Sequence, residues 1–322
     1  MRDVRSFSDL PTVSVEIITH NRANLLKHAI QSVLNQTYQD FEIIVVDDGS
    51  TDNIWEVVES FSDYRIRYIR HEQRRGGAAA RNTGVQAARG KYMAFLDDDD
   101  EWLPKKLELQ ISRIRESPEN VALIYTGSRH ISNGQTVKTL IPRKRGCIFE
   151  DMLYGNCTGN ASTLLVRMSV FSKVGLFDEN KLRGVDSGFI RQVSKDFKVD
   201  FVDEVLVNVS VDSPNRTTPV DTVAENKKCI KAIQYVLDKF SEDFRRFPRA
   251  RAHRYFQLAR HAYDIYAKNN DSSYRKTATR FTRKGLVLDF NFKMLVFGLA
   301  INVPGLWKVI NFLHKHMPKL ED

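Results

Sequence analysis

The sequence has few cysteines and no apolar leader, and both absences restrict the class of protein. Its three cysteines, Cys147, Cys157 and Cys229, are odd in number and lack CxxC spacing, which argues against a disulfide framework and against structural zinc. The first ten residues are charged and contain no apolar core, so we expect no secretory signal. We therefore expect a cytoplasmic protein in a reducing compartment.

A surplus of positive charge is absent from the first two thirds of the chain and is concentrated in the last third. Residues 221–322 hold 20 Lys/Arg against 10 Asp/Glu, which leaves 29 against 30 for residues 1–220. The formal net charge of +9 therefore lies entirely in the last third, which points to a separate role there. Anionic lipid heads, an anionic acceptor or nucleic acid would each suit this charge. The tail's aromatic residues follow helix spacing rather than a base-stacking platform, so we expect no nucleic acid.

Apolar periodicity predicts an α/β fold in residues 11–215. Short apolar runs alternate with helical patterns of about 10 to 13 residues, which is typical of a doubly wound, mostly parallel sheet flanked by helices. The predicted strands of the first half are 13–18, 42–46, 66–69, 91–96 and 121–125, and its predicted helices are 23–34, 51–60, 78–88 and 104–115. Further strands are expected at 162–166, near 201 and at 205–209, with helices at 169–174 and 186–195, and 129–146 is expected to be a hairpin or loop.

Polar residues follow several of these strands, where a doubly wound sheet binds ligands. Four aspartates, Asp97 to Asp100, come directly after an apolar run. Clustered carboxylates repel one another unless a cation lies among them, and oxygen ligands select Mg²⁺ or Mn²⁺ over zinc. The alternative is a solvated turn in which Asp100 or Glu101 caps the following helix.

Two other strand ends have equally ordinary alternatives. Asp47 and Asp48 precede Gly49 and Ser50; they either shape a turn, with Thr51 or Asp52 capping a helix, or accept a hydrogen bond from a nucleobase. The tip Thr19 to Arg22 can hold a base and a phosphate, or Asn21 or Asn24 can be an N-cap. The basic run Arg74 to Gly77 can approach phosphates closely or be a flexible turn.

Together these motifs resemble a known family. The runs VSVEIITHNRANLLKHAIQSVLNQTYQDFEIIVVDDGSTDN and GGAAARNTGVQAARGKYMAFLDDDDEWLPKKLE closely resemble family 2 glycosyltransferases of the GT-A fold. The resemblance is strong over residues 11–115 and looser to about 215. It implies an inverting, metal-dependent enzyme that moves a sugar, with a UDP-sugar as the expected donor, to a hydroxyl of a polysaccharide, lipopolysaccharide or lipid-linked glycan.

The resemblance also assigns roles to particular residues. Asp97 and Asp99 match the two acids of the Asp-x-Asp element, and are expected to bind Mn²⁺ or Mg²⁺ and the diphosphate. The other expected nucleotide-sugar contacts are Thr19, Asn21, Arg22, Asp48, Arg81 and Asp98. Asp186 matches the catalytic base, although Val185 stands where the family usually has Glu; the alternative is that Asp186 caps a helix. Where this chain has VNVSVDSPNR, many members of the family have the motif Tyr-Arg-x-His. Either Asp212 or Arg216 takes the place of that motif, or the acceptor side differs.

Residues 222–322 are predicted to be helical, after a boundary at 214–219. The stripe Ala252, Tyr255, Phe256, Ala259, Tyr263 and Tyr266, and a second from Leu295 to Leu313, either pack on the protein or lie on an anionic membrane surface. The predicted organisation is a catalytic domain at 11–215, with a nucleotide-binding half at 11–125 and an acceptor half at 126–215, followed by a basic helical region that is peripheral on the inner face of the membrane or packed on the protein. Two other functions stay open, a non-catalytic nucleotide-sugar binding module and a receiver-like signalling domain.

Overall fold

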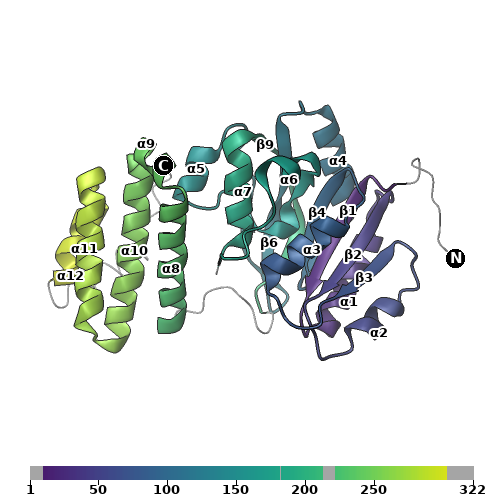
Figure 1. Cartoon of the computed structure of the whole chain (residues 1–322), viewed down its shortest axis with the longest axis horizontal. Helices are drawn as coiled ribbons and strands as arrows, with labels where there is room; N and C mark the ends of the chain where they lie inside the picture. The colour runs from purple at the N-terminus through teal and green to yellow at the C-terminus, as the bar shows by residue number, and fades with distance from the viewer. Residues whose placement is uncertain (1–9, 182, 213–221, 303–322) are drawn as a thin grey trace. The chain divides into compact units, whose positions relative to one another are not determined.

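The computed structural model describes residues 10–181, 183–212 and 222–302. The chain divides into two compact units, Met1–Arg216 and Thr217–Asp322. The first unit contains one mixed sheet and the second contains helices (Figure 1). The predicted boundary at 214–219 lies outside the described residues.

The first half of the first unit is a parallel sheet with crossover helices, as the alternation of patterns predicts. Strands β3, β2, β1 and β4 lie side by side in that order, and the pairings among these four strands are parallel. Their bounds are β1 Val13–Thr19, β2 Phe41–Asp47, β3 Ile66–Arg70 and β4 Tyr92–Asp97. The helices between and after them are α1 Ala23–Leu34, α2 Ile54–Glu59, α3 Gly77–Ala87 and α4 Lys106–Glu116.

The second half extends this sheet with antiparallel pairings. Strand β8 pairs antiparallel with β4 and β6, and β9 pairs parallel with β6 and antiparallel with β5. The added strands are β5 Asp100–Trp102, β6 Val121–Ser132, β7 Gln135–Leu140, β8 Leu165–Arg167 and β9 Lys198–Ser210. The other elements are α5 Phe149–Tyr154, the 3₁₀ turn η2 Ala161–Thr163, α6 Ser169–Val174 and α7 Val185–Asp196. The expected hairpin at 129–146 is formed by β6 and β7. The two strands expected near 201 and at 205–209 are instead one strand, β9, whose pairing with β6 contains shifts of register.

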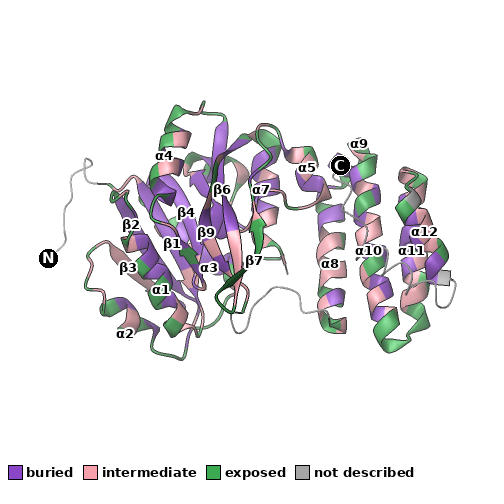
Figure 2. Cartoon of the chain, turned by 180° about the vertical axis from the view of Figure 1, so that it is seen from behind, coloured by how far each residue is buried: buried purple, intermediate pink, exposed green. Residues whose placement is uncertain are grey.

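Side chains of the sheet alternate between two apolar layers, and strands β1, β2 and β4 are coloured as buried over most of their length in Figure 2. Val15 and Ile17 of β1 pack on α1, α2 and α4, while Met93 and Phe95 of β4 pack on α3, α5, α6 and α7. This alternation follows from the two-residue period of a strand. It directs Glu16, between Val15 and Ile17, toward the layer that contains α3, where it is completely buried.

The second unit is a set of helices that pack on one another. Its elements are α8 Val223–Lys239, α9 Ser241–Arg246, α10 Pro248–Asn269, α11 Ser272–Leu288 and α12 Phe292–Asn302. The predicted stripe of α10 packs inside the unit: Tyr255 stacks on Phe281, and Phe256 meets Phe297 edge to face.

Of the second stripe, Leu295 is half-buried and Leu299 is 57 % exposed, whereas α12 buries Met294, Phe297, Ala300 and Ile301. This part of the stripe is therefore not packed inside the unit, and its membrane-surface alternative stays a prediction. The rest of that stripe lies outside the described residues. No helix among the described ranges is both long enough and apolar enough to cross a bilayer.

Candidate active site

The polar strand ends meet at one edge of the sheet. In the register of the parallel strands, Thr19 lies opposite Asp47, and Ile18 lies opposite Asp97. Thr19 Oγ1 donates a hydrogen bond of 2.7 Å to Asp98 Oδ2. Residues that are 79 positions apart in the sequence are therefore in contact at the carboxyl ends of β1 and β4.

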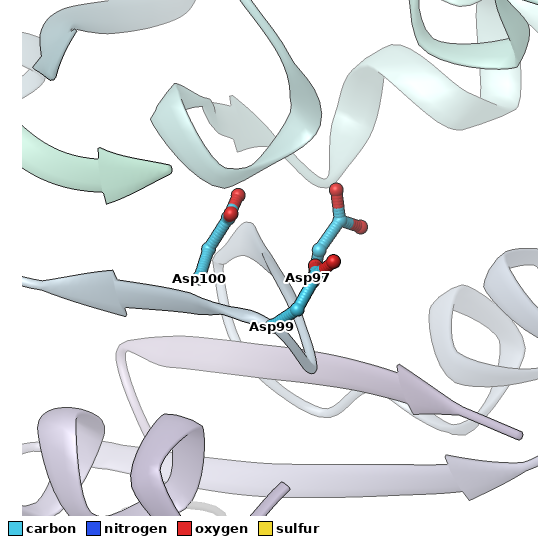
Figure 3. A group of neighbouring side chains, drawn as sticks. All are labelled: Asp97, Asp99 and Asp100. Carbon is cyan, nitrogen blue, oxygen red and sulfur yellow. The ribbon is translucent and has the colours of Figure 1, made fainter. Parts of the chain in front are cut away.

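Three carboxylates of the aspartate run form one cluster. One carboxylate oxygen from each of Asp97, Asp99 and Asp100 lies within 4.8 Å of the others, and Figure 3 shows the three side chains gathered on the turn between β4 and β5. Burial, and then repulsion by Asp97 and Asp99, raise the pKa of Asp100 well above its usual value. An oxygen-only set of this size suits Mg²⁺ or Mn²⁺ rather than zinc.

Asp100 belongs to this cluster and caps no helix, so the capping interpretation is wrong for it. It begins β5, and its Oδ2 accepts hydrogen bonds from Ser162 Oγ at 2.6 Å and from Asn160 Nδ2 at 2.8 Å. These two donors come from the turn before β8, and they fix the direction of the carboxylate. Asp100 cannot be distinguished from its neighbours by local pattern, because β5 has only three residues.

Asp98 faces the tip of β1. Arg22 Nη1 donates to Asp98 Oδ1 at 2.9 Å and to Asp99 Oδ2 at 3.3 Å. Burial raises the pKa of Asp98 to about 6, although Arg22 opposes this shift. Both Asp98 oxygens thus have partners within the chain, and Asp98 ties the aspartate turn to the first strand.

Arg81 lies among three acids. Its guanidinium is 2.7 Å from Asp97, 3.3 Å from Asp186 and 3.4 Å from Glu16, and the residue is only 4 % exposed. Burial alone would lower the pKa of Arg81, but the three carboxylates outweigh burial and raise it. A charged Arg81 therefore connects the aspartate cluster to α7.

Glu16 is the member of this network that the motif comparison missed. Burial raises its pKa to about 8, against the pull of Arg81, and its Oε1 has no hydrogen-bond partner. Gly84 of α3 makes the space, because a Cβ atom at that position would lie 1.8 Å from Glu16 Oε1. A single acid in the middle of the apolar run VSVEIIT was the signal in the sequence.

Asp186 lies in the first turn of α7 and is not its N-cap, so the capping interpretation is wrong. The N-cap is Gly184, which has a φ of 62°. Asp186 Oδ1 pairs with Arg81 Nε, and its Oδ2 accepts the Ala161 N–H at 3.3 Å. Burial raises the pKa of Asp186 and Arg81 lowers it, with a raised value as the result. The side chain remains 24 % exposed.

Asp48 organises the basic loop that follows β3. Its carboxylate accepts hydrogen bonds from the N–H groups of Arg75 and Gly76, both at 2.8 Å, and lies 2.9 Å from His71 Nδ1. Gly49 allows the two loops to meet, since a Cβ there would lie 2.7 Å from the Arg74 nitrogen. Asp47 has the turn role, because it accepts the Ser50 N–H at 2.8 Å.

Asn21 joins the tips of β1 and β2. It has a φ of 54°, and its Oδ1 accepts the Thr51 N–H at 2.7 Å. It is not the N-cap of α1, which is Arg22; Asp52 instead accepts the Ala23 N–H. The expectation that Thr51 or Asp52 caps α2 is also wrong, because the cap is Asn53.

Asp212 accepts hydrogen bonds from Ser132 Oγ and Asn133 N at the β6–β7 turn, and Arg216 lies outside the described residues.

A mixed α/β sheet flanked by helices, with a carboxylate cluster at the ends of its parallel strands, is the GT-A arrangement that the motifs predict. The family model "Glycosyl transferase family 2" matches residues 14–175, which is half of the chain. The chain belongs to glycosyltransferase family 2, as its motifs indicate.

Curated relatives include glycosyltransferases of archaea and bacteria. An uncharacterized glycosyltransferase of Methanocaldococcus jannaschii is 32% identical over 231 residues, which cover 68% of this chain and 77% of the relative. The Escherichia coli enzyme WfgD, a UDP-Glc:alpha-D-GlcNAc-diphosphoundecaprenol beta-1,3-glucosyltransferase, is 32% identical over 193 residues, which cover 55% of this chain and 74% of the relative.

Solved structures share the fold at low identity. S. aureus TarS in complex with UDP-GlcNAc has a TM-score of 0.63 and 15% identity, over 96% of this chain and 93% of that one. The mannosyltransferase PcManGT from Pyrobaculum calidifontis, in complex with GDP-Man and Mn²⁺, has a TM-score of 0.56 and 18% identity, over 93% and 88% of the two chains. At these identities the likeness concerns the fold alone, and it confirms the predicted GT-A architecture.

Proposed function

We propose that the chain is an inverting, metal-dependent glycosyltransferase that moves a sugar from a nucleoside diphosphate sugar to a hydroxyl of a lipid-linked glycan. The observation that carries the proposal is the network in which Arg81 joins Asp97 of the aspartate cluster to Asp186. Through Arg81, the network fixes the distance between the aspartate cluster, proposed to bind the diphosphate, and Asp186, proposed as the base. The family membership supplies the reaction class.

Asp97, Asp99 and Asp100 are the residues that would hold Mg²⁺ or Mn²⁺. Their spacing and the raised pKa of Asp100 fit a cation, which would neutralise negative charge on the departing diphosphate. Ser162 and Asn160 keep Asp100 directed into the cluster. Asp98 and Arg22 hold the turn that carries the cluster against β1.

Asp186 is proposed as the base that takes the proton from the acceptor hydroxyl. A raised pKa and partial exposure suit this role, because a carboxylate that binds a proton more tightly is a stronger base. Arg81 and the Ala161 N–H orient the two carboxylate oxygens. The proton leaves the acceptor oxygen as that oxygen forms its bond to the anomeric carbon, and the bond from that carbon to the diphosphate breaks.

The proposed donor is a UDP-sugar and the proposed acceptor a lipid-linked glycan. WfgD uses UDP-Glc and a diphosphoundecaprenol acceptor according to its name, and TarS was solved with UDP-GlcNAc. The nucleobase is proposed to lie near Thr19, Asn21 and Asp48, and the diphosphate near the Arg74–Gly77 loop, which Asp48 holds by its backbone. A lipid-linked acceptor also favours peripheral association with the inner face of the membrane.

Calorimetric titration of UDP in the presence of Mn²⁺ tests the donor and metal parts together. We expect binding that requires the metal and is lost in Asp99→Asn. Asp203→Asn, an exposed acid of the same unit, is the matched control and should bind as the wild type does. Equal binding by Asp99→Asn, or binding that ignores the metal, would contradict the assignment of the cluster.

A further inference from the structure

A groove on the helical unit has a strongly basic lining. It has a volume of about 900 Å³, within the range of about 300–1,000 Å³ that is typical of ligand pockets. Residues of α10 and α11 line it, and its apolar and aromatic members are Tyr255, Val287 and Leu288. Its six basic residues are Arg251, Arg275, Lys276, Arg280, Arg283 and Lys284.

Five of the six basic residues of this groove have no carboxylate partner among the residues that the structure describes. Arg275 Nε donates to the Ile301 carbonyl, but the other five basic residues form no ion pair with any described residue. Helix α11 contains no acid, and no carboxylate is found among the described groove residues. Like charges gathered in one hollow repel one another, so an anion that enters the groove relieves this repulsion.

Exposed apolar side chains adjoin the cations. Val287, at the end of α11 and in the groove lining, is 87% exposed, and Phe290, in the segment that follows, is 71% exposed. Tyr255 forms part of the lining, with Arg251 and Lys284 within 6 Å of its ring. A lipid headgroup places its phosphate beside acyl chains, which matches a groove whose cations lie beside exposed apolar side chains. A single-stranded nucleic acid is typically bound by aromatic side chains on which its bases stack.

We propose that this groove binds the phosphate-bearing headgroups of an anionic bilayer, with Val287 and Phe290 entering the apolar boundary of the lipids. The inference deepens the proposed peripheral membrane association and rests on it. It assigns the contact to one surface of the helical unit, the α10–α11 groove, rather than to the net charge of the last third.

Flotation of the full chain with vesicles tests the proposal. The wild type should bind vesicles of equal parts phosphatidylglycerol and phosphatidylcholine, and should not bind phosphatidylcholine alone. The triple variant Arg280→Gln, Arg283→Gln, Lys284→Gln should bind the anionic vesicles about a hundred-fold more weakly, at about five-fold for each basic residue near the surface. All three side chains are exposed, so the fold should be retained.

A matched variant removes the same charge elsewhere. Lys231→Gln, Arg246→Gln, Arg260→Gln changes three exposed residues of α8, α9 and α10 that do not line the groove, and it should keep most of the binding. The double variant Val287→Asn, Phe290→Asn should weaken vesicle binding. The same variant should bind a single-stranded oligonucleotide as weakly as the wild type does.

Each failure has a separate meaning. If the wild type does not bind anionic vesicles, the membrane association itself is wrong. If it binds but the two triple variants lose binding equally, the groove assignment is wrong. Oligonucleotide binding that is tighter than vesicle binding, and equally sensitive to the groove variant, would assign the groove to nucleic acid. None of these assays measures sugar transfer, so they do not depend on the catalytic assignment.

Discussion

Replacing Glu16 by Gln should stabilise the catalytic unit, and only above pH 5. Glu16 is completely buried and its pKa is raised to about 8 from 4.5. Between these two pH values the unfolded chain releases the proton while the folded chain keeps it. The free energy of unfolding therefore falls as pH rises through this window, by about 1.4 kcal/mol per pH unit, and is unaffected by Glu16 below pH 4.5.

The size of the effect follows from these two pKa values. pH 7 is two and a half pH units above the usual pKa of 4.5 that Glu16 has in the unfolded chain. Burial of Glu16 therefore lowers the free energy of unfolding by up to ~3 kcal/mol at pH 7. Glutamine has the same shape, still accepts from Arg81, and cannot ionise. The stability difference between Glu16→Gln and the wild type should thus be small at pH 5 and reach about 2 to 3 kcal/mol at pH 7.

Urea denaturation at pH 5, 6, 7 and 8, followed by near-ultraviolet circular dichroism, measures this difference. Glu42→Gln on the neighbouring strand is the control, because both of its carboxylate oxygens accept hydrogen bonds, from Ser14, Arg89 and Arg67. An amide there would direct a donor at other donors and should destabilise the fold by about 1–3 kcal/mol. A Glu16→Gln effect that is the same at every pH would refute the reasoning.

Three further predictions concern the same network. Gly84→Ala forces a Cβ against Glu16 Oε1 and should cost about 1–3 kcal/mol of stability in thermal or urea melts; the added variant Glu16→Ala should recover part of this loss, and no recovery would contradict the contact. Arg81→Lys keeps one charge but loses the fork that reaches Asp97 and Asp186, so we expect a fall in kcat of at least about ten-fold, with UDP affinity by calorimetry changed less; an unchanged kcat would argue against it. Ser162→Ala removes the 2.6 Å hydrogen bond to Asp100 and should weaken Mn²⁺-dependent UDP binding several-fold, whereas Ser172→Ala, at an exposed position of α6, should not.

The strand ends and most helices were predictable from local pattern. Helix α1 runs from Ala23 to Leu34, the range that its apolar spacing predicts, and the parallel order of β1, β2 and β4 brings Thr19, Asp47 and Asp97 to one edge. These features depend on period and on chain order, which a sequence contains.

The remaining features depend on contacts between distant segments. Asp98 and Asp100 are identical in type, yet one pairs with Arg22 and the other with Ser162 and Asn160, because the chain turns between them into the short strand β5. The sequence alone also allows Asp186 to cap α7, whereas in the structure the N-cap is Gly184, in a left-handed conformation. The position of Glu16 beside Gly84 requires the packing of α3 on β1.

The most direct test of the central assignment is a turnover assay of Asp186→Asn with a UDP-sugar panel and a lipid-linked GlcNAc diphosphate acceptor, read out as both UDP release and sugar transfer. The wild type and the control Asp203→Asn should transfer the sugar. Asp186→Asn should bind UDP with Mn²⁺ as the wild type does and lose transfer by about 10² to 10⁴-fold. Transfer by Asp186→Asn at the wild-type rate would contradict its role as the base, and no turnover by the wild type with any donor would contradict the proposed function.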